Sequence, residues 1–378
     1  MNIHQTDTSD LRISKSTKKH ARMKEYKHTR KKRKMSQISS GDSSYVDTSK
    51  PTAVFVPTSP RLQTLSVAIP GSILDKAKSH DQKTFLCGMI ARALAVFSVD
   101  EVVIYDDDYN PKVSPPRIVG SNEYSAYKDP SHFLAHLLEY LDTPPHLRKL
   151  LFPMHPNLRT AGCLPSLDMP HHPRPDEWCV YREGVVVSGP GEHPTLVETG
   201  LPKKVQLQEA LQQKTRVTLE FTSRENYEHS AKLVDRSTPS EVGGYYWGYR
   251  VRRCRSLSAV FTECPFPGGY DLSFGTSERG SPLSEVAAAQ GPDLINKHRH
   301  LLVVFGGVAG IESAVGSDPE LLERGLTPAT VKELFDHWIN ILPGQGSRTI
   351  RTEEAVWIGL MGIKGVVQQG VVTKSRTV

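Results

Sequence analysis

The stretch LPGQGSRTIRTEEA, residues 342–355, sets two glycines, two arginines, two carboxylates and three hydroxyls between two apolar segments. The preceding WINIL, residues 338–342, reads as a buried strand, and RTEEAVWIGLMGI, residues 351–363, reads as a helix. Glu353 and Glu354 fall near the start of that helix, where its dipole favours negative charge. The stretch is therefore predicted to be a strand-to-helix loop whose glycines allow the backbone to approach a ligand closely.

Two more turns of similar composition precede this loop. YDLSFGTSERG, residues 270–280, is expected to be a strand that ends in a hydroxyl- and glycine-rich turn, GTSERG. HLLVVFGGVAGIE, residues 300–312, is an apolar strand that runs into Gly306 and Gly307. Ligands in open α/β sheets bind beyond the carboxyl ends of the strands, where such turns converge. Together with PGQGSRT, residues 343–349, these turns predict a small-molecule site.

The chain beyond Arg61 begins with an α/β pattern. TLSVAIP, residues 64–70, and VDEVVIYDDD, residues 99–108, read as strands, and the helix between them follows an N-cap at Ser79. A second helix is expected over residues 132–142. The apolar positions that recur at helical spacing in the first helix are Phe85, Met89, Ile90, Ala93, Leu94 and Phe97.

Residues 180–253 have a different sequence pattern, which consists of short predicted β-strands. These are REGVVVS, KKVQL, TRVTLEFT and YYWGYRVRRC. Such runs predict a small inserted barrel, and an oligonucleotide-binding (OB) barrel fits. Its end combines basic and aromatic side chains, namely Arg250, Arg252, Arg253, Arg255, Tyr245, Tyr246, Trp247 and Tyr249. This mixture suits RNA, because arginines follow phosphates while bases stack on rings. A buried aromatic strand with a solvated basic end explains the same pattern, and both interpretations stay open.

The other segments read as follows. LSAVF, residues 257–261, predicts a strand, and Thr327 predicts the start of a helix, TVKELFDHW. The proline-rich residues 154–178 predict a loop. Its adjacent His171 and His172 lack further ligands at a recurrent spacing, so we interpret them as part of that loop and expect no metal.

The composition excludes several classes of protein. With 38% hydrophobic and 23% charged residues, the chain of 378 residues is long enough for two domains and has no apolar run of membrane-spanning length. The five cysteines form no CxxC pair, and the polar N-terminus predicts no secretory signal. We therefore expect reduced thiols in a cytosolic or nuclear protein that does not enter a membrane.

The positive charge is concentrated in the first 50 residues, where 13 Lys and Arg against five Asp and Glu give a net charge of +8. Since the whole chain is +6, the remainder carries about −2. Residues 18–34 alone contain ten basic residues. This run predicts a disordered tail that binds polyanions such as RNA or serves as a nuclear address, although a solvated tail without a partner is the alternative.

Standard nucleotide motifs do not describe the glycine-rich turns. Residues 343–349 lack the spacing and the Gly-Lys-Ser/Thr ending of a P-loop, and Thr349 stands where a dinucleotide fingerprint needs its third glycine. No GxSxG nucleophile motif is present either. A glycine-lined pocket without a phosphate clamp suits an adenosine-bearing ligand held by the backbone.

Six blocks of the sequence resemble one known family. They are TLSVAIPGSIL, IARALAVFSVDEVVIYDD, YYWGYRVR, GYDLSFGTSERG, HLLVVFGG and LPGQGSRTIRTEEA. The family is that of the SPOUT-type, S-adenosylmethionine-dependent RNA methyltransferases shared by eukaryotes and archaea. The resemblance implies a trefoil-knotted α/β domain of residues 61–175 and 254–378, an OB-like insertion of residues 176–253, and a basic tail of residues 1–60.

The resemblance also implies an activity, partners and a site. The activity is methylation of N3 of a uridine in large-subunit ribosomal RNA, by a homodimer. The basic N-terminal tail predicts that the protein is located in the nucleus or nucleolus, with the cytoplasm as a further location. Nuclear-import or mitotic-apparatus proteins are the other implied partners. Carried over by position, the residues that hold S-adenosylmethionine are Arg279, Gly306, Gly307, Asn340, Ile341, Leu342, Gly346, Ser347, Thr349, Ile350 and Thr352.

The chemistry requires loss of the proton on uridine N3. We expect Arg279 or Arg351 to stabilise negative charge on the uracil oxygens, and Glu353 to accept the proton or to orient Arg351. A purely structural pair of Arg351 and Glu353 is the alternative. The competing functions are an inactive SPOUT-like scaffold that binds RNA or a mitotic partner, and an α/β enzyme that uses another adenosine cofactor.

Overall fold

The computed structural model describes residue 57 and residues 59–108, 123–174, 177–189, 191, 194–291 and 298–374. Nearly all of the predicted basic tail lies outside the described residues. So do most of the loop at 110–130 and part of the loop at 281–299.

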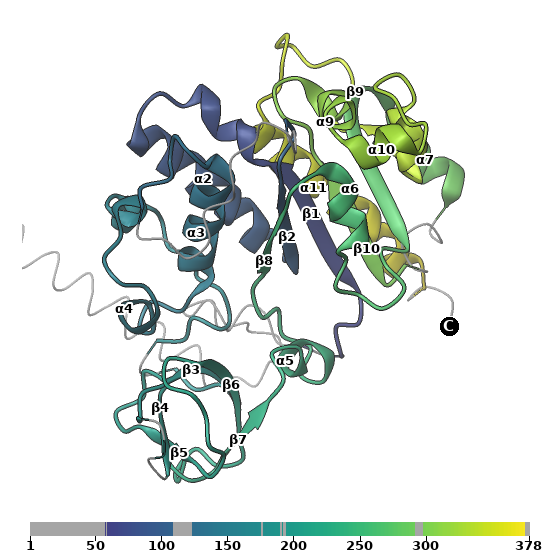
Figure 1. Ribbon diagram of the computed structural model, residues 1–378. Helices are drawn as coiled ribbons and strands as arrows, with labels where there is room; N and C mark the ends of the chain where they lie inside the picture. Colours follow the sequence, from purple (N-terminus) through teal and green to yellow (C-terminus); the bar gives the residue numbers. More distant parts are fainter. Residues whose placement is uncertain are drawn as a thin grey trace, which may run out of the picture. The chain divides into compact units, whose positions relative to one another are not determined.

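A six-stranded parallel sheet lies at the centre of the fold, with the strand order β11-β9-β10-β1-β2-β8 (Figure 1). Its strands are β1 (Thr64–Pro70), β2 (Glu101–Tyr105), β8 (Arg250–Cys254), β9 (Leu272–Pro282), β10 (His300–Val304) and β11 (His337–Asn340). The inner strands β1, β2 and β10 are buried over most or all of their length, because helices cover both faces of a parallel sheet. The predicted α/β sheet is confirmed.

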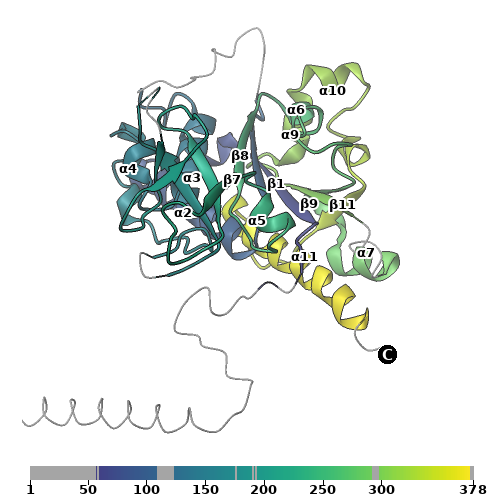
Figure 2. The same ribbon diagram turned by 90° about the horizontal axis from the view of Figure 1, so that it is seen from below.

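Helices pack on both faces of this sheet (Figures 1 and 2). One apolar core lies under α2 (His80–Val96), α3 (Pro130–Asp142) and α11 (Thr352–Lys374), and the other lies under α6 (Leu257–Thr262), α9 (Gly310–Gly316) and α10 (Pro319–Glu323). The shorter helices are η2 (Gly71–Lys76), α4 (Arg148–Leu151), η3 (Pro156–Leu158), η4 (Ala161–Cys163), α5 (Thr238–Glu241), α7 (Leu283–Gln290) and η5 (Val331–Leu334).

The predicted start of α2 is confirmed by its capping contacts. The Ser79 hydroxyl accepts a 3.2 Å hydrogen bond from the Gln82 amide, and the Gln82 side chain accepts one from the Ser79 amide. This reciprocal capping box satisfies two amides that the helix leaves without partners. The buried face of the helix differs from the prediction, however. Phe85 and Met89 are 51% and 47% exposed rather than buried in the core.

A separate antiparallel sheet has the strand order β5-β4-β3-β6-β7. Its strands are β3 (Tyr181–Val186), β4 (Thr195–Glu198), β5 (Val205–Leu207), β6 (Arg216–Phe221) and β7 (Ala231–Val234). The sheet curls so that its two edge strands, β5 and β7, contact each other, and its inner side encloses an apolar core of its own (Figure 1).

Three sequence-based expectations are wrong. The strand at residues 250–254 belongs to the six-stranded sheet, where β8 pairs with β2, and not to the small one. LSAVF forms helix α6, whose N-cap Ser256 accepts a 3.3 Å hydrogen bond from the Ala259 amide. The helix expected from Thr327 is only the short η5. Short apolar runs suit a strand or a helix, and strand partners are not encoded locally.

GTSERG is also not a turn at the end of a strand. Trp338 of β11 pairs with Gly275, and the next residue, Ile339, pairs with Ser281. Residues 276–280 therefore bulge out of the ladder between two paired segments of β9, and the edge strand β11 supplies the second pairing. This stretch of residues 276–280 is called the β9 bulge below.

Candidate functional site

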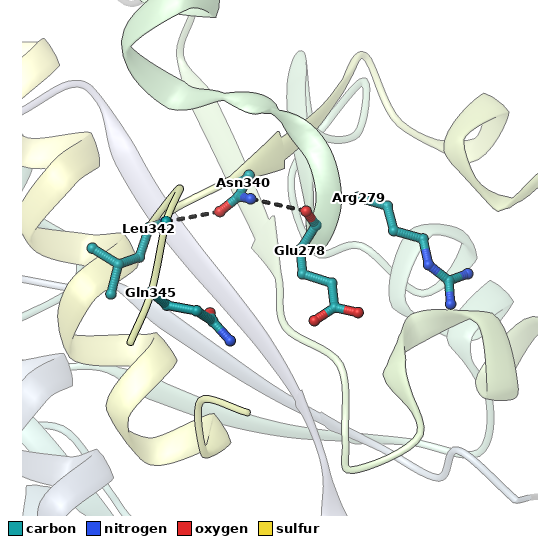
Figure 3. Close-up of a pocket in the computed structure, with 6 residues that line it drawn as sticks. Glu278, Arg279, Asn340, Leu342 and Gln345 are labelled. Carbon is teal, nitrogen blue, oxygen red and sulfur yellow. Dashed lines mark hydrogen bonds between the residues drawn. The ribbon is translucent and has the colours of Figure 1, made fainter. Parts of the chain in front are cut away.

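A pocket of about 340 Å³ lies beside the β9 bulge and the end of β11 (Figure 3). Its lining residues are Glu278, Arg279, Asn340, Leu342, Gly344 and Gln345. The first two belong to the β9 bulge, and the others belong to β11 or to the loop between β11 and α11, residues 341–351. Two of the three predicted turns, far apart in sequence, thus form the walls of one pocket.

Asn340 joins the two walls of the pocket. Its Nδ2 donates a 2.9 Å hydrogen bond to the carbonyl oxygen of Glu278, and its Oδ1 accepts one of 2.9 Å from the amide of Leu342 (Figure 3). One side-chain amide therefore fixes both the position of the β9 bulge and the backbone at the start of the loop after β11. An aspartate here would lack the donor and an alanine would lack both groups.

The third predicted turn, after β10, lies beneath this loop rather than in the pocket lining. Thr352 Oγ1 donates a 2.9 Å hydrogen bond to the carbonyl oxygen of Gly306. A Cβ atom on Gly306 would lie 2.7 Å from the Ile311 amide, so the tight turn requires glycine there. A Cβ atom on Gly307 would lie 2.8 Å from Asp107 Oδ2.

Most residues of the loop between β11 and α11 are exposed to solvent. Gly344 has a φ of +73°, which favours glycine, and a Cβ atom on Gly346 would have no neighbour within 4 Å. The side chains predicted to hold a ligand divide into two groups. Ser347 and Thr349 are exposed, and Ile341 and Ile350 are half-buried.

The predicted catalytic residues occupy two different places. Arg279 lines the pocket with a 76% exposed side chain, and one guanidinium nitrogen lies 3.8 Å from the Glu312 carboxylate. Arg351 lies 3.7 Å from the Glu353 carboxylate at the start of α11, and neither residue lines the pocket. Of the three, only Arg279 is thus placed to contact a molecule in the pocket.

Comparison with known proteins shows which family builds this site. A family model described as "Putative RNA methyltransferase" matches residues 64–363, which include the six-stranded sheet, the small sheet and the pocket. The chain belongs to this RNA methyltransferase family.

Named relatives match most of the length of this RNA methyltransferase. The human 28S rRNA (uridine-N(3))-methyltransferase is 44% identical over 317 residues, which cover 82% of this chain and 80% of the human protein. The Drosophila melanogaster protein of the same name is 38% identical and covers 82% of this chain and 63% of the fly protein. An uncharacterised protein of Halobacterium salinarum is 30% identical over 78% of this chain and 96% of its own length.

The arginines predicted to bind RNA are mostly engaged inside the methyltransferase. Arg252 donates to Glu101 Oε1 at 2.9 Å and to the Tyr270 hydroxyl at 3.0 Å, and Arg253 donates to Asp129 Oδ2 at 2.7 Å. Arg250 is the exposed member of the three. Among the neighbouring aromatic residues, Tyr246, Trp247 and Tyr249 are buried. These contacts agree with the interpretation as a buried aromatic strand, and RNA binding by Arg250, Arg252 and Arg253 stays a prediction.

The His171-His172 pair belongs to a buried polar junction that the sequence did not reveal. Both imidazoles contact the carbonyl oxygen of Asp142 through Nε2, at 2.8 and 2.7 Å. Within the part of the chain that the structure describes, no group of three or more His, Cys, Asp or Glu residues is placed to hold a metal ion. Nor is any helix in that part long and apolar enough to cross a membrane.

The Asp142 carboxylate connects α3 to the small sheet. Its Oδ2 accepts hydrogen bonds from Arg216 at 3.1 Å and from Arg236 at 2.8 Å, and Arg216 also donates to Glu183 Oε2 at 2.6 Å. Burial alone raises the pKa of Asp142, but the charges of Arg236 and Arg216 outweigh it and hold the pKa well below its ordinary value. The aspartate is therefore ionised and holds two arginines in place.

Proposed function

We propose that the protein transfers a methyl group from S-adenosylmethionine to N3 of a uridine in large-subunit ribosomal RNA. The observation that carries the proposal is the 44% identity, over 82% of the chain, to the human protein named for that reaction. The pocket between the β9 bulge and the loop after β11 supports it, because both walls come from segments that the matched family model covers.

The pocket fits a cofactor that carries adenosine. Its volume of about 340 Å³ lies within the range of small-molecule sites. The open surroundings of Gly346 and the positive φ of Gly344 let backbone amides and carbonyls reach a ligand without interference from side chains. We assign cofactor contacts to Asn340, Ile341, Leu342, Gly346, Ser347, Thr349, Ile350 and Thr352, with Gly306 and Gly307 supporting them from below. When bound, the cofactor supplies an electrophilic methyl group on a positively charged sulfur.

Arg279 has the position needed to stabilise the reacting base. Loss of the N3 proton leaves negative charge on the uracil oxygens, and an exposed guanidinium that lines the pocket can donate to them. We assign this role to Arg279. We assign Arg351 and Glu353 the role of a pair that holds the start of α11 under the loop, since neither lines the pocket.

We further propose that the domain built on the six-stranded sheet carries a SPOUT trefoil knot, and that the strands β3 to β7, residues 181–234, form an OB-like barrel. The path of α11 supports the knot. From the edge strand β11 the chain returns to the face that holds α2, where Trp357 Nε1 donates a 3.2 Å hydrogen bond to the Met89 carbonyl. The contact between the edge strands β5 and β7 supports the barrel.

A homodimer is part of the proposal. Phe85 and Met89 are exposed along one side of α2, and Met361 on α11 is 67% exposed. Trp357 on α11 donates a hydrogen bond to the Met89 carbonyl, so the two helices that carry these side chains are neighbours. Exposed apolar groups gathered in this way are typical of interfaces.

The ten basic residues between positions 18 and 34 support nuclear or nucleolar localisation and contact with RNA.

Nucleoside mass spectrometry of ribosomal RNA tests the function. Cells that lack the protein should lose one N3-methyluridine from large-subunit RNA, and the wild-type gene should restore it. An Arg279→Ala variant should fail to restore it while its purified form still binds S-adenosylhomocysteine in calorimetry. Unchanged N3-methyluridine in cells without the protein would contradict the reaction. Absence of cofactor binding by the wild type would favour a scaffold.

A further inference from the structure

Glu278 is the one carboxylate among the six residues that line the pocket. In Figure 3 its carboxylate is drawn between the Gln345 amide and the Arg279 guanidinium. Among the residues that the structure describes, no cation pairs with it at salt-bridge distance, whereas the neighbouring Arg279 lies 3.8 Å from Glu312. The carboxylate is therefore available to a molecule that enters the pocket.

Two contacts fix the position of the backbone at Glu278. The carbonyl oxygen of Glu278 accepts the 2.9 Å hydrogen bond from Asn340 Nδ2. Two residues later, Gly280 packs directly on the backbone of Ile339 and Asn340, where any side chain would collide. The backbone of the β9 bulge is thus held against β11 on both sides of the glutamate, which limits the directions that its side chain can take.

The reaction needs a group that takes a proton, and the pocket lining contains no histidine. The other acid considered from the sequence, Glu353, is 7% exposed and lies 3.7 Å from Arg351 outside the pocket lining. A general base must come within hydrogen-bond reach of the proton that it removes. Glu278 lines the pocket and can therefore reach a base that enters it, whereas Glu353 does not line the pocket.

We propose that Glu278 is the catalytic base that accepts the N3 proton of the target uridine, an inference that rests on the proposed function. The N3–H bond breaks, the proton moves to a carboxylate oxygen of Glu278, and the electron pair stays on N3. That pair forms the new bond to the methyl carbon while the carbon–sulfur bond breaks. The electrons of the broken bond stay on sulfur, which becomes a neutral thioether. Arg279, beside Glu278, stabilises the charge on the uracil oxygens during the step.

The test compares Glu278→Gln with the wild type under single-turnover conditions, on rRNA purified from cells that lack the protein. Glu278→Gln should slow methyl transfer by about 10²–10⁴-fold, the usual contribution of a general base. Its affinity for S-adenosylhomocysteine, measured by calorimetry, should stay at the wild-type value. Glu285→Gln, which alters an exposed glutamate on α7 outside the pocket lining, is the matched control and should leave both quantities unchanged.

Two further measurements separate a base from a residue that only positions the RNA. The rate of Glu278→Gln should rise about tenfold per pH unit, since the variant depends on spontaneous ionisation of N3, while the wild-type rate rises less steeply. An RNA whose target uridine is replaced by 5-fluorouridine, with its more acidic N3–H, should recover much of the lost rate in the variant. It should accelerate the wild type less.

Several results would overturn the assignment. A Glu278→Gln variant with the wild-type rate would show that the proton goes elsewhere. A slow variant without the pH dependence and without recovery on 5-fluorouridine would assign Glu278 to positioning. Loss of cofactor affinity would assign it to cofactor binding. A wild-type protein that methylates no uridine in this RNA would refute the proposed function itself, a result that the Glu278 variants cannot produce.

Discussion

Thr352 at the start of α11 and Gly306 after β10 are joined by a hydrogen bond of 2.9 Å from the threonine hydroxyl to the glycine carbonyl. The two residues are 46 positions apart, and Thr352 is 9% exposed. This bond ties the loop between β11 and α11 to the turn beneath it, as the Asn340–Glu278 bond ties the same loop to the β9 bulge. The loop is therefore held at both ends.

Replacing Thr352 with valine should loosen the C-terminal end of this loop. Valine keeps the shape of the side chain but leaves the Gly306 carbonyl without its donor, at a cost of about 1–3 kcal/mol. We expect a lower free energy of unfolding in urea and weaker binding of S-adenosylhomocysteine. Thr352→Ser, which keeps the hydroxyl, is the control, and equal behaviour of the two variants would show that the bond does not shape the pocket.

Asn340 should be sensitive to loss of its donor alone. Asn340→Asp retains an acceptor for the Leu342 amide but cannot donate to the Glu278 carbonyl. We expect methyl transfer to fall by at least tenfold and the affinity for S-adenosylhomocysteine to fall as well, because the β9 bulge is no longer held against β11. If Asn340→Asp matched the wild type in both assays, the acceptor bond to Leu342 would be the one that matters.

Arg252 should contribute to stability rather than to RNA binding. Arg252→Met removes a guanidinium from Glu101, which is 3% exposed, and leaves that carboxylate buried without its cation. Such a loss costs about 3–5 kcal/mol, and partial exposure of the arginine places the expected value at the lower end. Thermal denaturation of Arg252→Met and of Arg250→Met, at an exposed position, gives the comparison. An equal drop in melting temperature would contradict the structural role.

The Asp142 junction should make stability depend on pH in the acid range. Because the folded pKa of Asp142 is held well below its unfolded value of about 3.9, the stabilisation is present above about pH 4 and is lost as the pH falls further. Asp142→Asn should lower the free energy of unfolding by about 3–5 kcal/mol at pH 7, since Arg216 and Arg236 lose their counter-charge. The difference from the wild type should shrink toward pH 3.

Denaturant unfolding at several pH values measures this effect. Asp168→Asn is a suitable control, because Asp168 is exposed and asparagine tolerates its φ of +53°. A difference between Asp142→Asn and the wild type that stayed constant from pH 7 to pH 3 would show that the aspartate charge is not the source of the stability.

Local sequence predicted the elements whose formation depends on their own residues. The strand at 64–70, the helix that starts after Ser79 and the strand at 300–304 appear where periodicity and capping residues place them. The glycine-rich loop at 343–349 was predicted for the same reason, since its composition excludes a helix or a strand. Its family resemblance pointed to a cofactor site, and the structure places a pocket there.

Tertiary structure decided what depends on partners distant in sequence. GTSERG looked like a turn, but pairing with β11 on both sides of residues 276–280 made it a bulge that carries Glu278 into the pocket. Arg252 looked like a ligand for RNA, yet Glu101, 151 residues away, takes its guanidinium. Composition and spacing report the propensities of a segment, whereas β-sheet pairing and buried charges are settled by groups that only the folded chain brings together.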